Sequence, residues 1–131
     1  MKVNNKTIVV TGGGSGMGRE LTLLLLKKGA RVAVADVNSK GMEETVSLAG
    51  DLKNNLSIHQ LDISNRNEVL AFPEKVIGQH GAVDGIINNA GIIHQFMPVN
   101  GLDFDKIERV MNINFYGALN MIKAFLPHLL K

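Results

Sequence analysis

The residues best suited to chemistry form a glycine-rich stretch near the N-terminus, Thr11-Gly12-Gly13-Gly14-Ser15-Gly16-Met17-Gly18. The apolar run before it, residues 7–10, is typical of a buried parallel strand, and the leucine-rich run from Leu21 onward is typical of a helix. In that helix Met17, Leu21, Leu24 and Leu25 fall on one face, which Leu23 and Leu26 widen. A glycine turn lets backbone N–H groups approach an anion, and the positive end of the helix points to the same place. The turn therefore predicts an anion-binding loop or a tight connection.

Three known glycine motifs can be compared with this stretch. A phosphate-binding P-loop needs Lys and then Ser or Thr after its last glycine, where this chain has Arg19 and Glu20. A nucleophile elbow centred on Ser15 needs a glycine where Met17 stands. The glycines that fit the turn are Gly12, Gly16 and Gly18, so the strict dinucleotide fingerprint Gly-x-Gly-x-x-Gly fails as well. What remains is the looser spacing Thr-Gly-x-x-x-Gly-x-Gly.

Polar residues follow three further predicted strands. Asp36 ends the second strand, where a carboxylate can accept both hydroxyls of an adenosine ribose or can simply begin a turn. Asp62 ends the third strand and suits either the adenine amino group or a helix cap. Asn88-Asn89-Ala90-Gly91 follows the fourth strand, and Asn89 is placed to brace the glycine loop. A carboxylate at position 36 would repel the 2′-phosphate of NADP, so NAD is the preferred cofactor.

The elements that must position these residues alternate between strands and helices. Strands are predicted at residues 7–10, 31–35, 56–61 and 83–88, and this alternation specifies an α/β fold with a doubly wound parallel sheet. Right-handed crossovers make the strand order 3-2-1-4. In such a sheet, ligands bind beyond the carboxyl ends of the strands at the switch point, here between the first and fourth strands.

A long helix is predicted over residues 103–126, ending before Pro127. Asn114 falls inside its apolar stripe, so it is expected to be buried and to need hydrogen-bond partners. Gly117, one turn later, predicts a close approach of another segment. Tyr116 is the only tyrosine, and Asn120 stands four residues after it, so the chain has no Tyr-x-x-x-Lys pair.

Length and composition exclude several function classes. The 131 residues make one domain, residues 1–131, and the net charge of +2 with scattered basic residues does not predict nucleic-acid binding. There is no cysteine, and the four histidines are far apart in the sequence, so no metal site is predicted. No apolar run is long enough to cross a membrane, and no signal peptide is seen, so a cytoplasmic location is expected.

Taken together, these motifs resemble the short-chain dehydrogenase/reductase family over the whole chain, through the Thr-Gly-x-x-x-Gly-x-Gly loop, Asp36, Leu61-Asp62-Ile63, Asn88-Asn89-Ala90-Gly91 and Asn114-Phe115-Tyr116-Gly117. The resemblance implies a Rossmann-type fold and hydride transfer between NAD(P) and a small alcohol or carbonyl substrate. It assigns Asn114 as the catalytic Asn, which supports a water and proton relay. The predicted cofactor-binding residues are Gly12, Ser15, Gly16, Met17, Gly18, Asp36, Asp62, Ile63, Asn89, Ala90 and Gly91.

The chain departs from the family in length. Family members continue beyond the long helix with a Ser-bearing strand, the Tyr that acts as general acid/base and its Lys partner, so this sequence matches a truncated, cofactor-binding half. We expect the 131-residue chain to lack dehydrogenase turnover and to associate into homo-oligomers through the helix at residues 103–126. A non-catalytic nucleotide-binding module stays open as an alternative. An S-adenosylmethionine-dependent methyltransferase shares the glycine loop and the strand-end acid, but it does not call for Asn-Asn-Ala-Gly.

Overall fold

The computed structural model describes all residues, 1–131, and contains one parallel sheet of four strands in the predicted order, β3-β2-β1-β4. The strands are β1 (Thr7–Thr11), β2 (Arg31–Asp36), β3 (Leu56–Gln60) and β4 (Gly85–Ile87). Every residue of β1 is buried, as its uninterrupted apolar pattern predicts for a central strand covered on both faces.

Strand β4 is shorter than the predicted residues 83–88, and Asp84, directly before it, caps the start of β1. The Asp84 Oδ2 atom accepts the Thr7 backbone N–H at 2.8 Å, and the Asp84 N–H donates to the Thr7 carbonyl. This Thr7 hydrogen bond, aided by the Lys6 side chain 3.3 Å away, lowers the pKa of the Asp84 carboxyl group. The amino ends of the two strands are thereby tied together.

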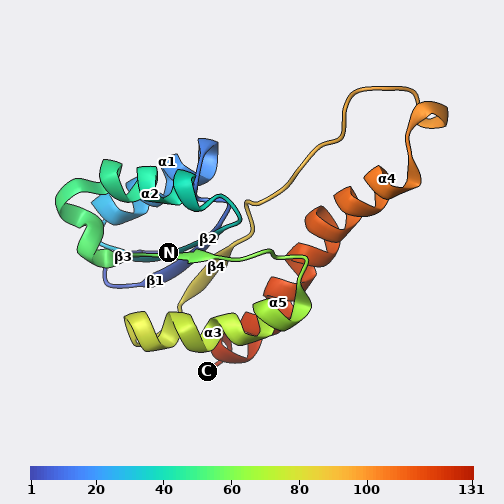
Figure 1. Ribbon diagram of the computed structural model, residues 1–131. Coiled ribbons are helices and arrows are strands. Elements are labelled where there is room, and N and C mark those ends of the chain that lie inside the picture. The colour runs from blue at the N-terminus through green and yellow to red at the C-terminus, as the bar shows by residue number, and fades with distance from the viewer.

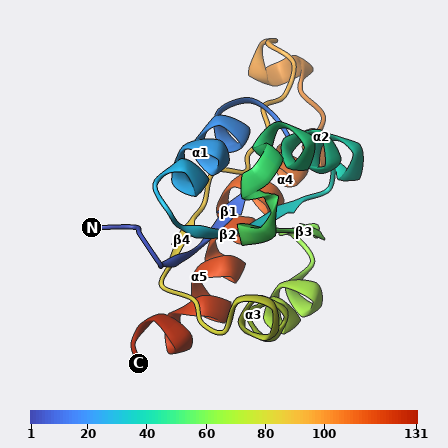
Figure 2. The same ribbon diagram turned by 90° about the vertical axis from the view of Figure 1, so that its left-hand side faces the viewer.

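Helices cover both faces of the sheet and make three layers (Figure 2). Helices α1 (Gly16–Lys27) and α2 (Ser39–Ala49) lie on one face, and α3 (Arg66–His80) and α5 (Ala118–Leu129) lie on the other. Each face has its own cluster of buried apolar side chains. Two short 3₁₀ helices, η1 (Gly50–Asn55) and η2 (Val99–Gly101), lie in the connections.

The helix ends follow the sequence signals. Asn38 caps α2 by accepting the Gly41 N–H, and Asn65 caps α3 by accepting the Glu68 N–H, as is typical of asparagine before a helix. Of the apolar face predicted for α1, Leu25 and Leu26 are buried as expected, whereas Met17 and Leu24 are exposed, and the small residues Gly18 and Thr22 are buried in their place. The helix turns the small residue Gly18 toward β1, since only a residue without a side chain fits there.

The predicted long helix over residues 103–126 is three helical segments. The chain runs as α4 (Phe104–Met111), then as the π-helical segment η3 (Asn112–Gly117), and then as α5, which continues through Pro127 to Leu129. The proline does not end the helix, because Phe125 just before it is fully buried and holds this part of the chain against α3. Figure 1 shows α4 projecting away from the layered body at the end of a long loop.

Segment η3 also explains why Asn114 is exposed rather than buried as predicted. A π turn closes i→i+5 hydrogen bonds, so the residues on either side of it are rotated relative to one uninterrupted α-helix. The close approach predicted at Gly117 is confirmed, since a Cβ atom there would lie 2.7 Å from Cγ1 and Cδ1 of Ile63. None of the helices combines the length and the apolar composition needed to cross a bilayer.

Candidate functional site

A hollow of about 520 Å³ opens at the carboxyl ends of the strands. Residues of α4 and η3 also line it. The ends of all four strands contribute to it, directly or through the first residues that follow them. Its location is the one predicted, because the order 3-2-1-4 places the switch point between β1 and β4.

The glycine loop forms one wall of this hollow. Gly12 and Gly16 adopt φ values of +75° and +54°, which L side chains rarely adopt. Ser15, Gly16 and Met17 line the hollow at the N-terminus of α1, and this N-terminus has no side-chain cap and no acidic residue in its first turn. By contrast, α2 and α3 are both capped by asparagine side chains. The first backbone N–H groups of α1 are therefore free to bind an anion.

Gly18 lies beneath the loop rather than on the surface of the hollow. A Cβ atom at this position would overlap the Gly12 carbonyl oxygen and would lie 2.5 Å from Nδ2 of Asn89. The absence of a side chain at Gly18 therefore allows α1 to pack directly against the end of β1.

The Asp36 carboxylate is held in place by two backbone groups at the end of β2. Its Oδ2 atom accepts the Gly14 N–H at 2.9 Å, and its Oδ1 atom accepts the Asn38 N–H at 3.0 Å. The side chain lines the hollow next to Val37. Because each carboxylate oxygen has a further lone pair, Asp36 can still accept hydrogen bonds from a ligand.

Asp62 and Ile63 follow β3 and line the same hollow. The Asp62 Oδ1 atom accepts both the backbone N–H and the hydroxyl of Ser64, at 2.9 and 2.6 Å. The side chain therefore forms a local turn and leaves the capping of α3 to Asn65. Both of these hydrogen bonds go to Oδ1, and Asp62 as a residue is exposed.

Asn89 and Thr11 connect β4 to the glycine loop. The Thr11 hydroxyl accepts the backbone N–H groups of Asn89 and Ala90, each at 3.0 Å. The Asn89 Nδ2 atom donates to the carbonyls of Thr11 and Gly12 at 3.1 and 3.4 Å. These hydrogen bonds brace the loop from below, which is the structural role considered for Asn89 from the sequence.

Asn114 fastens the segment that follows Gly91. Its Oδ1 atom accepts the Ile92 N–H and its Nδ2 atom donates to the Ile92 carbonyl, both at 2.8 Å. The side-chain amide thus pairs with the backbone of Ile92 much as a neighbouring strand would. A Cβ atom at Gly91 would lie 3.3 Å from the Asn114 Oδ1, so the glycine leaves room for this contact.

The predicted site residues line the hollow together except Gly18, which is buried beneath the glycine loop, and Asn114, which contacts the lining residue Ile92. Further lining residues were not predicted as cofactor contacts from the sequence: Ala35, Val37, Leu61, Ser64, Ile92, Arg109, Asn112 and Ile113. Several of these come from α4 and η3, whose position relative to the sheet no local pattern specifies. Nowhere do three or more His, Cys, Asp or Glu side chains converge as a metal site requires.

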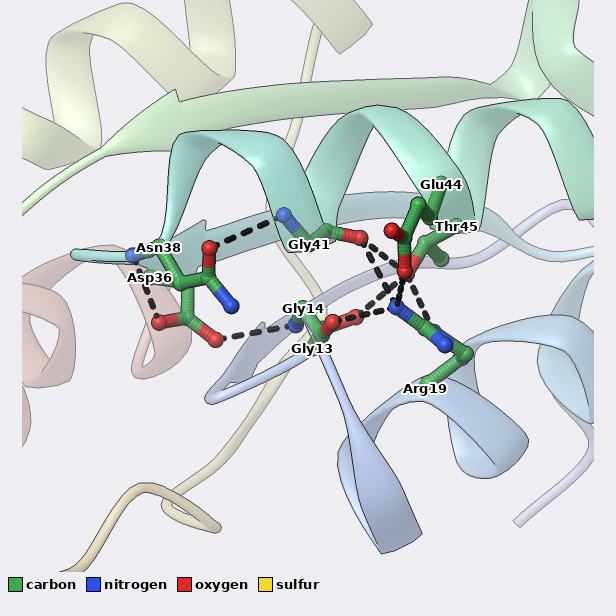
Figure 3. Close-up of polar contacts among 8 residues, drawn as sticks. All are labelled: Gly13, Gly14, Arg19, Asp36, Asn38, Gly41, Glu44 and Thr45. Carbon is green, nitrogen blue, oxygen red and sulfur yellow. Dashed lines mark hydrogen bonds and ion pairs between the residues drawn. The ribbon is translucent and has the colours of Figure 1, made fainter.

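Arg19 is a residue of this region whose contribution the sequence reasoning missed. It lies in the first turn of α1, yet its guanidinium group contacts the glycine loop and α2 (Figure 3). A signal was present, because a cation near the positive end of a helix is unfavourable unless other groups compensate for it. An arginine in that position therefore predicts nearby oxygen acceptors.

The comparisons with known proteins agree with this geometry. A family model described as short chain dehydrogenase matches residues 6–131. The chain is 41% identical to SadH of Mycobacterium tuberculosis over 125 residues, a match that covers 95% of this chain and 45% of SadH. The chain thus spans about half the length of the relatives it matches.

Solved structures match the fold over almost the whole chain. One is the 3-ketoacyl-(acyl-carrier-protein) reductase from Brucella melitensis complexed with NADH, at a TM-score of 0.90 and 29% identity, covering 96% of this chain and 51% of that one. Another is a short chain dehydrogenase/reductase from Burkholderia phymatum in complex with NAD, at a TM-score of 0.93 and 25% identity, covering 99% of this chain and 46% of that one. The family model matches this chain from residue 6 to the last residue, and the sheet has the predicted strand order with the glycine loop after β1. This chain therefore belongs to the short-chain dehydrogenase family.

Proposed function

We propose that this chain is the cofactor-binding half of an NAD(P)-dependent oxidoreductase that transfers hydride between nicotinamide and an alcohol or carbonyl substrate. The observation that carries the proposal is the uncapped N-terminus of α1, which faces the hollow between Gly12 and Gly16. Family membership supports it, as does the likeness to proteins solved with NADH and with NAD.

The residues of the hollow fit a dinucleotide. The free N–H groups of α1 and the open space at Gly16, where a Cβ atom would meet nothing within 4 Å, suit a pyrophosphate group. Asp36 would accept the hydroxyls of the adenosine ribose, and Asp62 with Ile63 would contact the adenine. Ala90 and Gly91 would form the floor, which Asn89 supports from below.

The preference for NAD over NADP rests on Asp36. Its carboxylate lines the hollow, where the 2′-phosphate of NADP would bring a second negative charge close to it. The next residue, Val37, supplies no cation to offset that repulsion. The proposed cofactor is therefore NAD, with NADP bound more weakly.

When bound, the nicotinamide would supply the hydride acceptor or donor. The residues of this chain would bind and orient it, and Asn114 would hold the backbone of Ile92, which lines the hollow. The relay role that the family resemblance implies for Asn114 stays part of this proposal. The 131 residues include no Tyr-x-x-x-Lys pair for acid/base catalysis, so we expect binding without turnover.

Isothermal titration of the chain with NAD, NADP and S-adenosylmethionine tests the proposal. We expect NAD to bind about tenfold more tightly than NADP, and Asp36→Asn to reduce that ratio to about one. Asp51→Asn, in the exposed segment η1 before β3, is the matched control and should leave both affinities unchanged. Binding of S-adenosylmethionine without binding of NAD or NADP would contradict the proposal. If the natural protein contained no catalytic segment, NAD binding by the chain would instead favour a non-catalytic nucleotide-binding module.

Association of two copies along residues 103–126 is also part of the proposal. Helix α4 has no buried residue, and Phe104, Met111 and Phe115 expose large apolar side chains along this stretch. Light scattering over a range of chain concentrations tests this association. We expect the mass to rise toward that of a dimer, and a mass that stays monomeric would contradict it.

A further inference from the structure

Two nitrogen atoms of the Arg19 guanidinium group, Nε and Nη2, donate to oxygen atoms of the loop and α2. Its Nη2 atom donates to the carbonyls of Gly14 at 2.6 Å and Gly41 at 3.1 Å, and it pairs with the Glu44 carboxylate at 3.0 Å. Its Nε atom donates to the Thr45 hydroxyl at 3.1 Å. Figure 3 shows these contacts converging on one side chain between the two helices.

This arrangement compensates for an unfavourable position. The Arg19 side chain is only 19% exposed and lies near the positive end of α1. A cation so placed destabilises the fold unless oxygen acceptors surround it. One of the acceptors, the Gly14 carbonyl, belongs to the glycine loop and the others belong to α2, so Arg19 ties the loop to that helix.

Arg19 also belongs to a closed ring of hydrogen bonds that includes Asp36. The Gly14 N–H donates to the Asp36 carboxylate, while the Gly14 carbonyl accepts from Arg19. On the other side, the Asn38 N–H donates to Asp36, the Asn38 side chain accepts the Gly41 N–H, and the Gly41 carbonyl accepts from Arg19. We call this set of residues, Arg19, Gly14, Asp36, Asn38 and Gly41, the Arg19 ring.

Gly14 is the connection between the two charges in the ring. It is buried, and a Cβ atom there would lie 2.8 Å from the Asp36 Oδ2, so the peptide sits directly against the carboxylate. Its N–H and its carbonyl are each engaged, one by Asp36 and the other by Arg19. A loss of the Arg19 contact would free the peptide to tilt away from Asp36.

We propose that Arg19 is a positioning residue that sets the preference for NAD over NADP by fixing Gly14, and through it the Asp36 carboxylate. The inference rests on the proposed function. A carboxylate discriminates between a ribose hydroxyl and a 2′-phosphate only while it is held at the ribose, because both the hydrogen bonds and the repulsion weaken with distance. The guanidinium group places Nη2 against both carbonyls while its Nε donates to the Thr45 hydroxyl, and a lysine, with one nitrogen on a flexible stem, does not reproduce both sets of contacts.

The test compares Arg19→Lys with Arg31→Lys. Arg31 likewise donates to a backbone carbonyl and a threonine hydroxyl, those of Asn5 and Thr7, but at the amino end of the strands. Titration calorimetry gives the dissociation constants of both variants for NAD and NADP. We expect Arg19→Lys to weaken NAD binding about tenfold and to lower the NAD preference about fivefold, while Arg31→Lys changes the preference by less than about twofold.

A second readout needs no cofactor. Hydrogen exchange of the Gly14 amide, followed by NMR, should become faster in Arg19→Lys and stay unchanged in Arg31→Lys. If Arg19→Lys does not fold, Thr45→Val removes the hydroxyl that accepts from the Arg19 Nε atom and should shift the same two readouts in the same direction, by about threefold.

The outcomes separate the inference from the proposed function. A parent chain that binds neither NAD nor NADP overturns the proposed function and the inference with it. A parent chain that prefers NAD, combined with an Arg19→Lys variant of unchanged preference and unchanged Gly14 exchange, overturns the inference alone. A fall in thermal stability with no change in preference assigns Arg19 a purely structural role and also overturns it.

Discussion

Helices α4 and α5 follow one another along the chain, yet they differ in almost every contact. In α5, Met121 and Phe125 are fully buried against β1, β4 and α3. In α4 no residue is buried, and Phe104 is 82% exposed. By sequence α4 is the more clearly amphipathic of the two helices. The difference teaches that an apolar stripe predicts a helix and a face, while burial depends on what the fold places opposite that face.

Segment η3 lies at the transition between α4, which has no buried residue, and α5, which is packed against the rest of the fold. Gly117 at its end packs against Ile63, and Asn114 in its middle holds the backbone of Ile92. Asn120, one turn into α5, is buried and donates to the Ile63 carbonyl at 3.0 Å. The stretch of chain that packs closely on the rest of the fold, which we call the seat of α5, therefore begins at Gly117. Helix α4 lies outside this stretch.

The largest expected effect comes from truncating one phenylalanine in each helix. Phe125→Ala should lower the free energy of unfolding by about 3–5 kcal/mol, because it leaves a cavity against Phe72. In the monomeric chain, Phe104→Ala should change it by less than about 0.5 kcal/mol, since that ring is then in solvent. Urea unfolding followed by circular dichroism measures both, at chain concentrations at which light scattering shows a monomer. Similar losses for the two variants under these conditions would show that α4 is covered within the single chain and would break the comparison.

Adding one methyl group at the boundary should have the next largest effect. Gly117→Ala places a Cβ atom against Ile63 and should destabilise the fold by about 1–3 kcal/mol through overpacking. The double variant with Ile63→Ala should lose less than the sum of the two single variants, because the clash is removed. Additive losses would mean that the seat of α5 does not begin at Gly117.

A smaller effect on the free energy of unfolding is expected from the protonation of the histidines that pack near α5. The Ser57 hydroxyl lies 2.8 Å from Nε2 of His59 and 2.7 Å from Nε2 of His80. The His59 ring packs edge-on against Phe72, whose ring packs in the same way against Phe125. Burial, followed by the charges of His80 and Lys75, lowers the pKa of His59 from 6.5 to about 4.

Stability should therefore fall with pH over a defined window. Above pH 6.5 His59 is neutral in both the folded and the unfolded chain, whereas between pH 6.5 and about 4 the unfolded chain takes up the proton more readily. The contribution of His59 is complete above this window and is lost as the pH falls through it. Because the ring is partly open to solvent, we expect a loss of about 1–2 kcal/mol.

Urea unfolding at several pH values between 7 and about 4 measures this slope. His59→Asn should flatten it, and His94→Asn, in the exposed loop before α4, serves as the control that should keep it. His80 adds to the slope of the parent chain, because burial and the charge of Arg31 lower its pKa as well. An unchanged slope in His59→Asn would contradict the role assigned to this histidine cluster in the stability of the packing around α5.

Much of the sheet and of the candidate site was predictable, because the signals are local. The strands at residues 7–10 and 31–35 and the caps at Asn38 and Asn65 each depend on a few neighbouring residues. The site followed from topology, since parallel strands bring their carboxyl ends to one edge and so place Asp36 near Asn89. The roles of these residues toward a cofactor remain proposals that the titrations test.

The errors share a different cause. Asn114 was expected to be buried and Met17 to share an apolar face with Leu25, because each was placed on an ideal helix with a continuous apolar stripe. The π turn in η3 interrupts that ideal around Asn114, and the close packing of Gly18 on Gly12 and Asn89 puts Gly18 on the buried side of α1 while Met17 is exposed. A hydrophobic period within one helix reveals neither effect.

By itself, the sequence determined the alternation of strands and helices, the parallel sheet order and the set of polar residues at the strand ends, because these depend on local propensity and on the handedness of crossovers. The tertiary structure alone decided that Arg19 holds Gly14 against Asp36, that Asn114 pairs with Ile92, and that α5 is buried while α4 is not. Each of these depends on the distance between segments that are far apart in the chain. Only the packed fold sets those distances.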